Sequence, residues 1–138
     1  MRAELAADPD EALRLAIQAP LVAYNEAIAG PSGFRLLGVA LKDAEGSACG
    51  GLWGHTAFGW LYIQLLAVPQ AARGRGLGRE LVREAEREAV ARGCRHAWVD
   101  TIFGAQGFYE RLGYRVFGEL PDHPPGFTRR FLAKDLLT

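Results

Sequence analysis

The sequence has few cysteines and no excess of charge of either sign. Its 138 residues include two cysteines, Cys49 and Cys94, with no CxxC pair and no dense spacing that would indicate a disulfide framework. Sixteen basic residues balance sixteen acidic ones, whereas nucleic-acid-binding proteins usually show a basic excess. We therefore expect reduced thiols and no nucleic-acid partner, although a local basic loop could still receive an anionic cofactor.

Long apolar runs are also missing. No stretch approaches the ~18 apolar residues of a membrane-spanning helix, and the acidic start MRAELAADPDEALR lacks the apolar segment of a signal peptide. These features predict a cytoplasmic protein with no membrane partner. No repeat or obvious linker interrupts the chain, so its ordinary globular composition predicts a single domain spanning residues 1–138.

Turn signals divide the chain into alternating helices and strands. Asp8-Pro9-Asp10 predicts a helix start, apolar residues recur at helical spacing as far as Ile28, and Pro20 is expected to kink or split that helix. The other expected elements are a short edge strand at 1–6, strands at 34–41, 48–58, 60–68, 96–101, 114–120 and 128–134, and helices at 76–92 and 105–112. This order predicts an α/β (α+β) fold with a mixed sheet flanked by helices.

Two of these segments carry sharper expectations. The strand at 60–68 is almost wholly apolar, which suits a central strand buried on both faces. The helix at 76–92 shows an apolar stripe that we expect to face the core. The stripe consists of Leu77, Leu81, Val82, Ala85, Ala89 and Val90.

The loop Arg73-Gly74-Arg75-Gly76-Leu77-Gly78 opens that helix. Unpaired N–H groups and the positive end of the helix dipole favour an anion there, and glycines let it approach the backbone. A Walker A loop needs GxxxxGK[ST], which is absent, and a dinucleotide GxGxxG starting at Gly74 fails at Arg79. The pattern that does match is [Q/R]xxGx[G/A], and a simple glycine-rich turn is the alternative.

A second motif follows at residues 105–114, AQGFYERLGY. It is similar to the AxxFYxxxGF segment of the GCN5-related N-acetyltransferase (GNAT) superfamily, with Tyr114 in the place of the last Phe. The glycine loop matches the acetyl-CoA signature of the same superfamily. Because both motifs occur in the expected order, the chain resembles this superfamily over roughly residues 60–136.

The resemblance implies a GNAT acyl-CoA N-acyltransferase fold with acetyl-CoA as co-substrate and no metal. Acetyl-CoA would lie where the strands at 60–68 and 96–101 splay apart, and a primary amine would attack its thioester directly through a tetrahedral intermediate. The acceptor would be a small amine or a protein amine, and a homodimer is possible. The implied cofactor-binding residues are Leu66, Ala67, Val68, Arg73, Gly74, Arg75, Gly76, Leu77, Gly78, Phe108 and Tyr109.

Tyr109 suits the role of general acid. A phenol has a reference pKa of about 10 and a thiol one of about 8.5, so the phenol stays protonated and can hydrogen-bond a departing thiolate. General acid help of this kind typically contributes ~10²–10⁴-fold. The alternative is an amphipathic core tyrosine whose hydroxyl finds a partner.

The general base is not assigned by the motifs. Many relatives carry Asn seven residues before the tyrosine and an acid on the cofactor strand, where this chain has Ile102 and Gln64. Asp100, His55 and Glu119 are candidates, as is a water chain to solvent. A strand-end Asp is often only a turn residue, and a lone His is often only a hydrogen-bonding residue.

The acceptor site and two rival functions stay open. Trp53, Trp60, Tyr62, Phe103 and Phe127 could form an aromatic wall or simply belong to the core, and the loop around His123 could line the acceptor site. One rival is a non-catalytic acyl-CoA sensor of the same fold. The other is a metal-dependent vicinal-oxygen-chelate protein, which would need clustered metal ligands and repeated halves.

Overall fold

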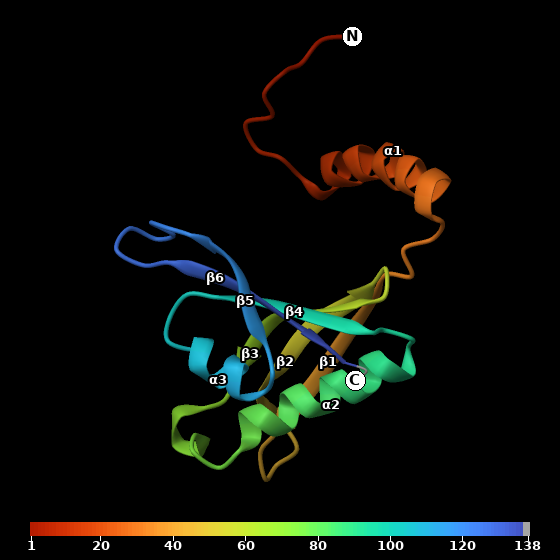
Figure 1. The fold of residues 1–138 in the computed structure, drawn as a ribbon. Helices are drawn as coiled ribbons and strands as arrows, with labels where there is room; N and C mark the ends of the chain where they lie inside the picture. Colours follow the sequence, from red (N-terminus) through yellow and green to blue (C-terminus); the bar gives the residue numbers. More distant parts are fainter. Residues whose placement is uncertain (137–138) are drawn as a thin grey trace. The chain divides into compact units, whose positions relative to one another are not determined.

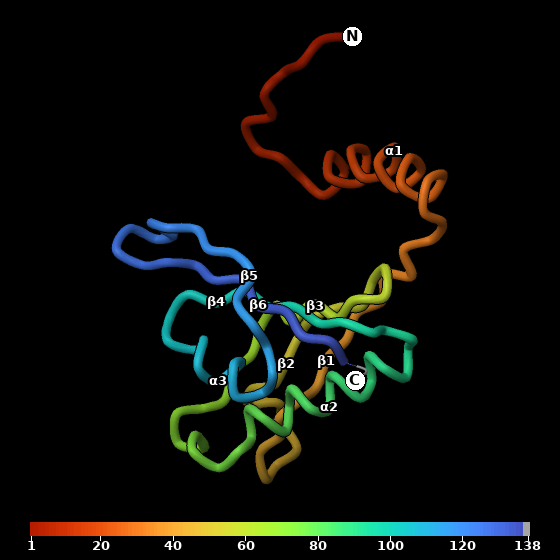
Figure 2. Tube along the Cα trace, viewed as in Figure 1, coloured from red at the N-terminus to blue at the C-terminus, as the bar shows by residue number. Residues whose placement is uncertain are grey.

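The computed structural model describes residues 1–136 and consists of two compact units, Met1–Ser32 and Gly33–Thr138 (Figures 1 and 2). The first unit contains one helix, α1 (Glu11–Ala29), which begins where the Asp10 side chain accepts a hydrogen bond from the Leu13 amide at 2.9 Å. Pro20 lies inside α1 without splitting it. The single domain predicted for residues 1–138 stays a prediction.

The edge strand predicted for residues 1–6 is wrong. These residues are exposed and form no strand, because alanine and charged side chains favour strands weakly and no ladder partner is present. None of the described helices combines the length and the apolarity needed to cross a membrane.

The second unit is built on a six-stranded mixed sheet, as expected. Its strands are β1 (Arg35–Lys42), β2 (Ala48–Ala57), β3 (Trp60–Ala67), β4 (His96–Thr101), β5 (Arg115–Leu120) and β6 (Arg129–Asp135). The spatial order is β1-β2-β3-β4-β6-β5, with β3 and β4 as the parallel pair and the other neighbours antiparallel. The connections carry α2 (Leu77–Ala91), α3 (Gln106–Arg111) and a 3₁₀ turn, η1 (Gln70–Ala72).

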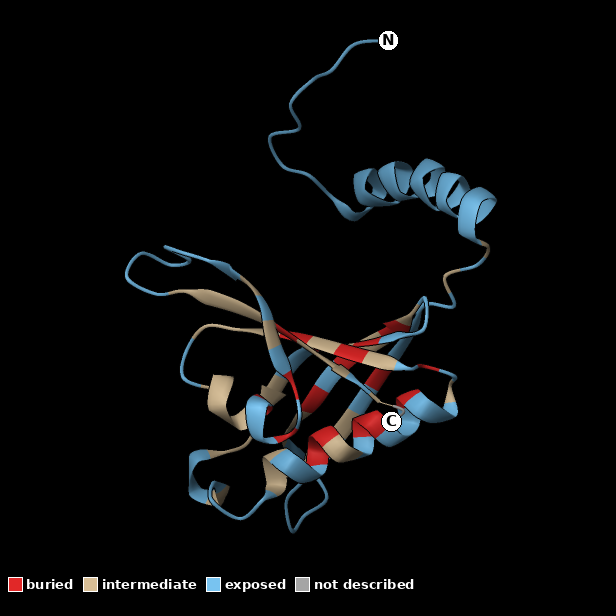
Figure 3. Ribbon diagram, viewed as in Figure 1, coloured by how far each residue is buried: buried red, intermediate tan, exposed pale blue. Residues whose placement is uncertain are grey.

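Burial alternates along the strands (Figure 3), and the two faces of the sheet differ. The closed face packs against α2 and α3, and its buried side chains are Leu37, Leu52, Leu61, Ile63, Ala97, Val99 and Leu132. The opposite, open face carries Leu36, Trp53, Trp60, Tyr62, Leu65, Trp98, Phe117 and Phe131. The prediction that β3 is buried on both faces is therefore wrong, since Trp60 is 37% and Leu65 60% exposed.

The buried side of α2 also departs from its predicted stripe. Leu81, Val82, Ala85 and Ala89 are buried as expected, but Val90 is exposed and Glu86 is buried. The Glu86 carboxylate accepts hydrogen bonds from the Tyr114 hydroxyl at 2.8 Å and from Lys134 at 3.0 and 3.1 Å. Its partners are far away in the sequence, so a pattern within α2 alone cannot reveal its burial.

The parallel pair β3–β4 separates halfway along its length. Its register runs from Trp60–His96 to Ile63–Val99 and then stops. Beyond that point β3 stays paired with β2 as far as Ala67, while β4 stays paired with β6 as far as Thr101. The two strands therefore diverge at the centre of the sheet, next to the start of α2.

Candidate cofactor cleft and active site

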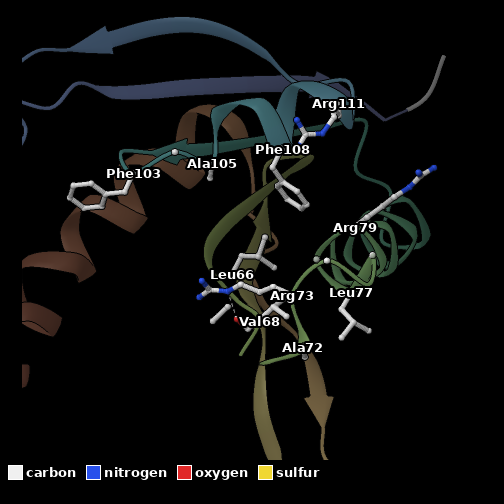
Figure 4. Close-up of a pocket in the computed structure, with 15 residues that line it drawn as sticks. Leu66, Val68, Ala72, Arg73, Leu77, Arg79, Phe103, Ala105, Phe108 and Arg111 are labelled. Carbon is white, nitrogen blue, oxygen red and sulfur yellow. Dashed lines mark hydrogen bonds between the residues drawn. The ribbon is translucent and has the colours of Figure 1, made fainter. Parts of the chain in front are cut away.

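A cleft of about 820 Å³ lies at this divergence. Figure 4 shows side chains from the end of β3, the start of α2 and the α3 region around it. Its lining includes nine of the residues predicted to bind the cofactor: Leu66, Ala67, Val68, Arg73, Gly74, Gly76, Leu77, Gly78 and Phe108. Six further lining residues were not predicted: Ala72, Arg79, Phe103, Gly104, Ala105 and Arg111.

The β3 wall of the cleft offers unpaired backbone. Leu66 and Ala67 pair with Leu52 and Gly51 of β2 on one side, while their other side faces the gap left by β4. An extended ligand with amide groups can add to such an edge in the manner of a further strand. Residues 66–68 thus suit the pantetheine part of coenzyme A.

The floor of the cleft is an anion cradle at the start of α2. Gly74 and Gly76 take positive φ angles of 82° and 77°, and a Cβ built on either would meet no heavy atom within 4 Å. Gly76 caps α2 without any side-chain hydrogen bond to the first turn. The first amides of the helix are therefore available to an anion, as a pyrophosphate requires.

Gly78 has a different, steric reason for being glycine. A Cβ at this position would lie 3.2 Å from two ring atoms of Phe108. The absence of a side chain lets the α3 aromatic approach α2 across the cleft, and Figure 4 shows the Phe108 ring directed into this space. The loop thus combines open space at Gly74 and Gly76 with one close approach at Gly78.

Positive charge surrounds the cradle. Arg73, Arg79 and Arg111 all line the cleft, and the Arg73 Nε donates to the Val68 carbonyl at 3.0 Å, which ties the loop to the end of β3. Arg75 and Tyr109, which were also predicted to bind the cofactor, are not among the lining residues. Arg79 lies in the first turn of α2, so its place in the sequence could have predicted that it lines the cleft. Arg111 lies in α3, and only the folded structure shows that it lines the cleft.

Tyr109 belongs to α3 and is buried, with 4% of the residue exposed. It makes edge-to-face contacts with Phe108 and Tyr114, at centroid distances of 5.0 and 5.7 Å. Burial raises the pKa of Tyr109 to about 12, and the negative charge of Asp100 adds to the rise. The phenol thus stays protonated at neutral pH, as a proton donor to a thiolate must.

Asp100 belongs to a polar cluster one residue beyond the last β3–β4 pair. Its carboxylate accepts a hydrogen bond from the Tyr62 hydroxyl at 2.9 Å and forms an ion pair with Arg129 of β6. Burial, followed by the bond to Asp100, raises the pKa of Tyr62 to about 12. The Arg129 Nε is enclosed and has no hydrogen-bond partner within residues 1–136, so the cluster holds one unused donor.

The other candidate bases occupy distinct places. His55 lies in β2 on the open face, with its ring 4.8 Å from Phe34 and 5.4 Å from Tyr62, and burial lowers its pKa below 6.5. Glu119 is half-exposed in β5 and pairs with Arg130 at 3.2 Å. Gln64 is an exposed residue of β3.

Four of the five aromatic residues named for an acceptor wall or for the core have exposed side chains, namely Trp53, Trp60, Phe103 and Phe127, so the core alternative is wrong for them. Tyr62 stacks on Trp98 at 4.2 Å, and Phe103 meets Phe127 edge-on at 5.0 Å. Within residues 1–136, no three His, Cys, Asp or Glu side chains gather so as to hold a metal ion.

Comparisons with known proteins agree with this geometry. The family model of the acetyltransferase (GNAT) family matches residues 4–114. The acetyltransferase Atu2258 of Agrobacterium fabrum is 46% identical over 120 residues, which cover 86% of this chain and 88% of that protein. Blasticidin-S acetyltransferase of Streptomyces morookaense is 46% identical over 94 residues, 67% of this chain and 69% of that protein.

A solved structure extends the likeness to three dimensions. The crystal structure of an acetyltransferase from Agrobacterium tumefaciens has a TM-score of 0.92 and 43% identity, covering 98% of this chain and 99% of that one. The vicinal-oxygen-chelate alternative is therefore wrong. The chain belongs to the GNAT family of acetyltransferases, as an acetyl-CoA-dependent N-acetyltransferase.

Proposed function

We propose that the protein transfers the acetyl group of acetyl-CoA to a primary amine of a small polar molecule, by direct attack of the amine on the thioester. The observation that carries this proposal is the cleft itself. A free strand edge and an open glycine cradle with three arginines line one gap in the sheet, and the buried, protonated Tyr109 contacts Phe108 of this lining. These are the parts needed to hold an acyl thioester, neutralise its phosphates and protonate its leaving group.

The cofactor would be held along the length of the cleft. Residues 66–68 bind its pantetheine arm through the backbone, while the first amides of α2 and the side chains of Arg73 and Arg79 bind its pyrophosphate. Gly74 and Gly76 leave room for that group because nothing lies within 4 Å of their missing Cβ atoms. Acetyl-CoA supplies an activated acyl group to this site when it is bound.

Tyr109 acts as the general acid. The amine nitrogen forms a bond to the carbonyl carbon, the carbon–sulfur bond breaks, and the sulfur takes the Tyr109 proton. With a pKa of about 12, the phenol keeps this proton until the thiolate develops. Its position on the closed face, under the splayed strands, leaves the open face to the acceptor.

Asp100 positions the acceptor in this proposal. An amine approaching from the open face meets the Asp100 carboxylate beside the end of the β3–β4 ladder. Because Tyr62 and Arg129 already engage that carboxylate, it is better suited to attracting an ammonium group than to removing its proton. The proton then goes to His55, which is uncharged at neutral pH since burial lowers its pKa.

The acceptor class rests on one relative and on the shape of the open face. Blasticidin-S acetyltransferase shares 46% identity with 67% of this chain, and the aromatic side chains of the open face can stack on a flat ring. We therefore place a cationic, ring-containing amine, such as a nucleoside antibiotic, first among the acceptors. A peptide N-terminus and an aminoglycoside are the comparison substrates.

The test is release of the CoA thiol from acetyl-CoA, followed with a thiol reagent in the presence of each amine. We expect release that depends on the acceptor and is saturable for at least one small amine. Mass spectrometry of the product identifies the acetylated nitrogen. If acetyl-CoA binds but no amine of a broad panel is acetylated, the protein is instead a non-catalytic acyl-CoA sensor.

A further inference from the structure

Arg129, the first residue of β6, has hydrogen-bond donors that the fold does not use. Its Nη1 donates to the Asp100 carboxylate. Nε and Nη2 form the other edge of the guanidinium; neither donates to a group within residues 1–136, and the Nε is enclosed. Arginine binds carboxylates through two parallel hydrogen bonds from one edge. Enclosed polar groups are nearly always paired, so this edge indicates a missing partner.

Arg92 shows how the same fold treats a structural arginine. Its side chain is 14% exposed, against 24% for Arg129. The Arg92 Nε donates to Glu88 at 3.3 Å, and its Nη1 donates to the Leu36 carbonyl and the Thr56 hydroxyl, both at 3.1 Å. Arg92 therefore ties α2 to the sheet with both parts of its guanidinium, whereas the ion pair of Arg129 uses one nitrogen.

The unused edge belongs to a site beside the cofactor cleft. Asp100 lies three residues before Phe103, which lines the cleft, and Arg129 lies two residues after Phe127. The Phe103 and Phe127 rings meet edge-on at 5.0 Å, so the ion pair and the ring pair are neighbouring contacts between the same two segments. The charge of Asp100 also helps to raise the pKa of Tyr109. A group bound to Arg129 would thus lie close to the proposed general acid.

The charges at this site are balanced before an acceptor binds. Asp100 and Arg129 carry one negative and one positive charge and form an ion pair. A lone ammonium group at Asp100 would compete with Arg129 for the same carboxylate and leave a positive charge uncompensated in a partly buried site. An acceptor that also carries a carboxylate restores the balance. A phosphate dianion would instead leave an excess negative charge.

We propose, building on the function proposed above, that the acceptor carries a carboxylate as well as its amine. The amine lies at Asp100, and the carboxylate accepts hydrogen bonds from Nε and Nη2 of Arg129. A rotation of the Arg129 side chain turns the enclosed Nε toward the ligand, and pairing of this donor favours the rotation. Arg129 is then a specificity-determining residue for the acceptor.

The size of the site selects among such molecules. The amine and the carboxylate of the acceptor are separated by the guanidinium and the hydrogen bonds around it, which together span on the order of 6 Å. This distance exceeds that in an α-amino acid, in which both groups share one carbon. It suits an acceptor whose two groups lie at different positions of a ring.

Two probes that differ in one charge test this proposal, 3-(aminomethyl)benzoate and 3-(aminomethyl)benzamide. Both place a benzylic amine on a flat ring, and the benzoate alone carries a carboxylate. Release of the CoA thiol from acetyl-CoA should give a kcat/KM that is about 10–100-fold higher for the benzoate, as expected for a hydrogen-bonded charged group. Equal values would overturn the proposal, while acetylation of both probes would still support the proposed function.

Arg129→Lys locates the preference. Lysine keeps a positive charge beside Asp100 but lacks the two-donor edge, so KM for the benzoate should rise by about 10-fold and KM for the benzamide should stay near wild type. Arg130→Lys is the matched control, because Arg130 is the next residue and pairs with Glu119 at 3.2 Å; it should keep the preference. An equal loss for both probes in Arg129→Lys would show that Arg129 serves the fold.

Binding separates this proposal from the proposed function. Calorimetric titration of the CoA-saturated protein with each probe requires no turnover. Tighter binding of the benzoate, lost in Arg129→Lys, supports the carboxylate site even if neither probe is acetylated, a result that would count against the proposed function. If the wild type neither binds nor acetylates the benzoate, the carboxylate site is wrong, and thiol release with another amine would still support the proposed function.

Discussion

Two clusters of tyrosine, carboxylate and cation lie on opposite faces of the sheet and differ in one respect. Under α2, Glu86 is bound by Tyr114, Lys134 and Arg83, and Tyr114 is 1% exposed. At the cleft, Asp100 is bound by Tyr62 and Arg129, and all three are only partly buried. The closed cluster leaves no room for a ligand, whereas the open one borders the acceptor site that we propose. In this proposal the same trio of groups stabilises the fold in one place and serves the substrate in the other.

Tyr109 and Tyr114 give the sharpest contrast, since their rings are 5.7 Å apart. Tyr109→Phe should lower kcat by ~10²–10⁴-fold, because the departing thiolate loses its proton donor, and acetyl-CoA affinity should change little. Steady-state kinetics and calorimetry measure the two quantities. Tyr114→Phe is the control, expected to weaken stability but to keep kcat, and equal kcat in Tyr109→Phe and wild type would reject the acid role.

Glu86→Gln should have the largest effect on stability. The change leaves the Lys134 ammonium without its carboxylate in a site where both side chains are at most 15% exposed, and breaking such a pair costs about 3 kcal/mol. Urea denaturation measures the free energy of unfolding. Activity per folded molecule should stay near wild type, and a loss of turnover without a loss of stability would contradict the division between the two clusters.

Asp100→Asn should show the reverse pattern. It keeps the shape of the side chain but removes the charge that attracts the acceptor amine, so we expect kcat/KM to fall by about 10–100-fold. Because the Arg129 and Asp100 side chains are 24% and 13% exposed, against 15% and 8% for Lys134 and Glu86, the free energy of unfolding should fall by less than in Glu86→Gln. An equally large fall in stability would make Asp100 a structural residue like Glu86.

The pH profile gives the smallest effect. Burial lowers the pKa of His55 below 6.5, so it is uncharged and able to accept a proton at neutral pH. With saturating acceptor, kcat should therefore fall only below pH 6.5. No fall should occur on the alkaline side up to about pH 10, because Tyr109 has a pKa of about 12. His55→Gln should remove the acidic fall, and an unchanged profile in that variant would reject His55 as base.

The cofactor half of the site could be predicted from the sequence because its information is local. Gly74, Gly76 and Gly78 follow one strand and begin one helix, so a short pattern describes the whole cradle. The acceptor half could not be predicted in the same way. Arg129 contacts Asp100 because β6 lies between β4 and β5 in the sheet. The spacing of residues along the sequence does not reveal such a contact.

The burial of residues in α2 and β3 could likewise be predicted only in part. The apolar period of α2 correctly placed Leu81, Val82, Ala85 and Ala89 in the core. It failed for Glu86, whose charge is compensated by residues of β6 and of the loop before β5. The prediction for β3 failed as well. Its nearly continuous apolar run indicated burial on both faces, but Trp60 and Leu65 are exposed on the open face.

Calorimetric titration with acetyl-CoA, beside free CoA and NADPH, tests the cleft most directly when wild type and Gly76→Asp are compared. Gly76 has a φ of 77° and open space around its Cα, so Asp would add both strain and negative charge to the anion cradle. We expect wild type to bind acetyl-CoA and CoA but not NADPH, and Gly76→Asp to bind none of them while staying folded. Undiminished acetyl-CoA binding by folded Gly76→Asp would show that the cofactor does not lie at the start of α2.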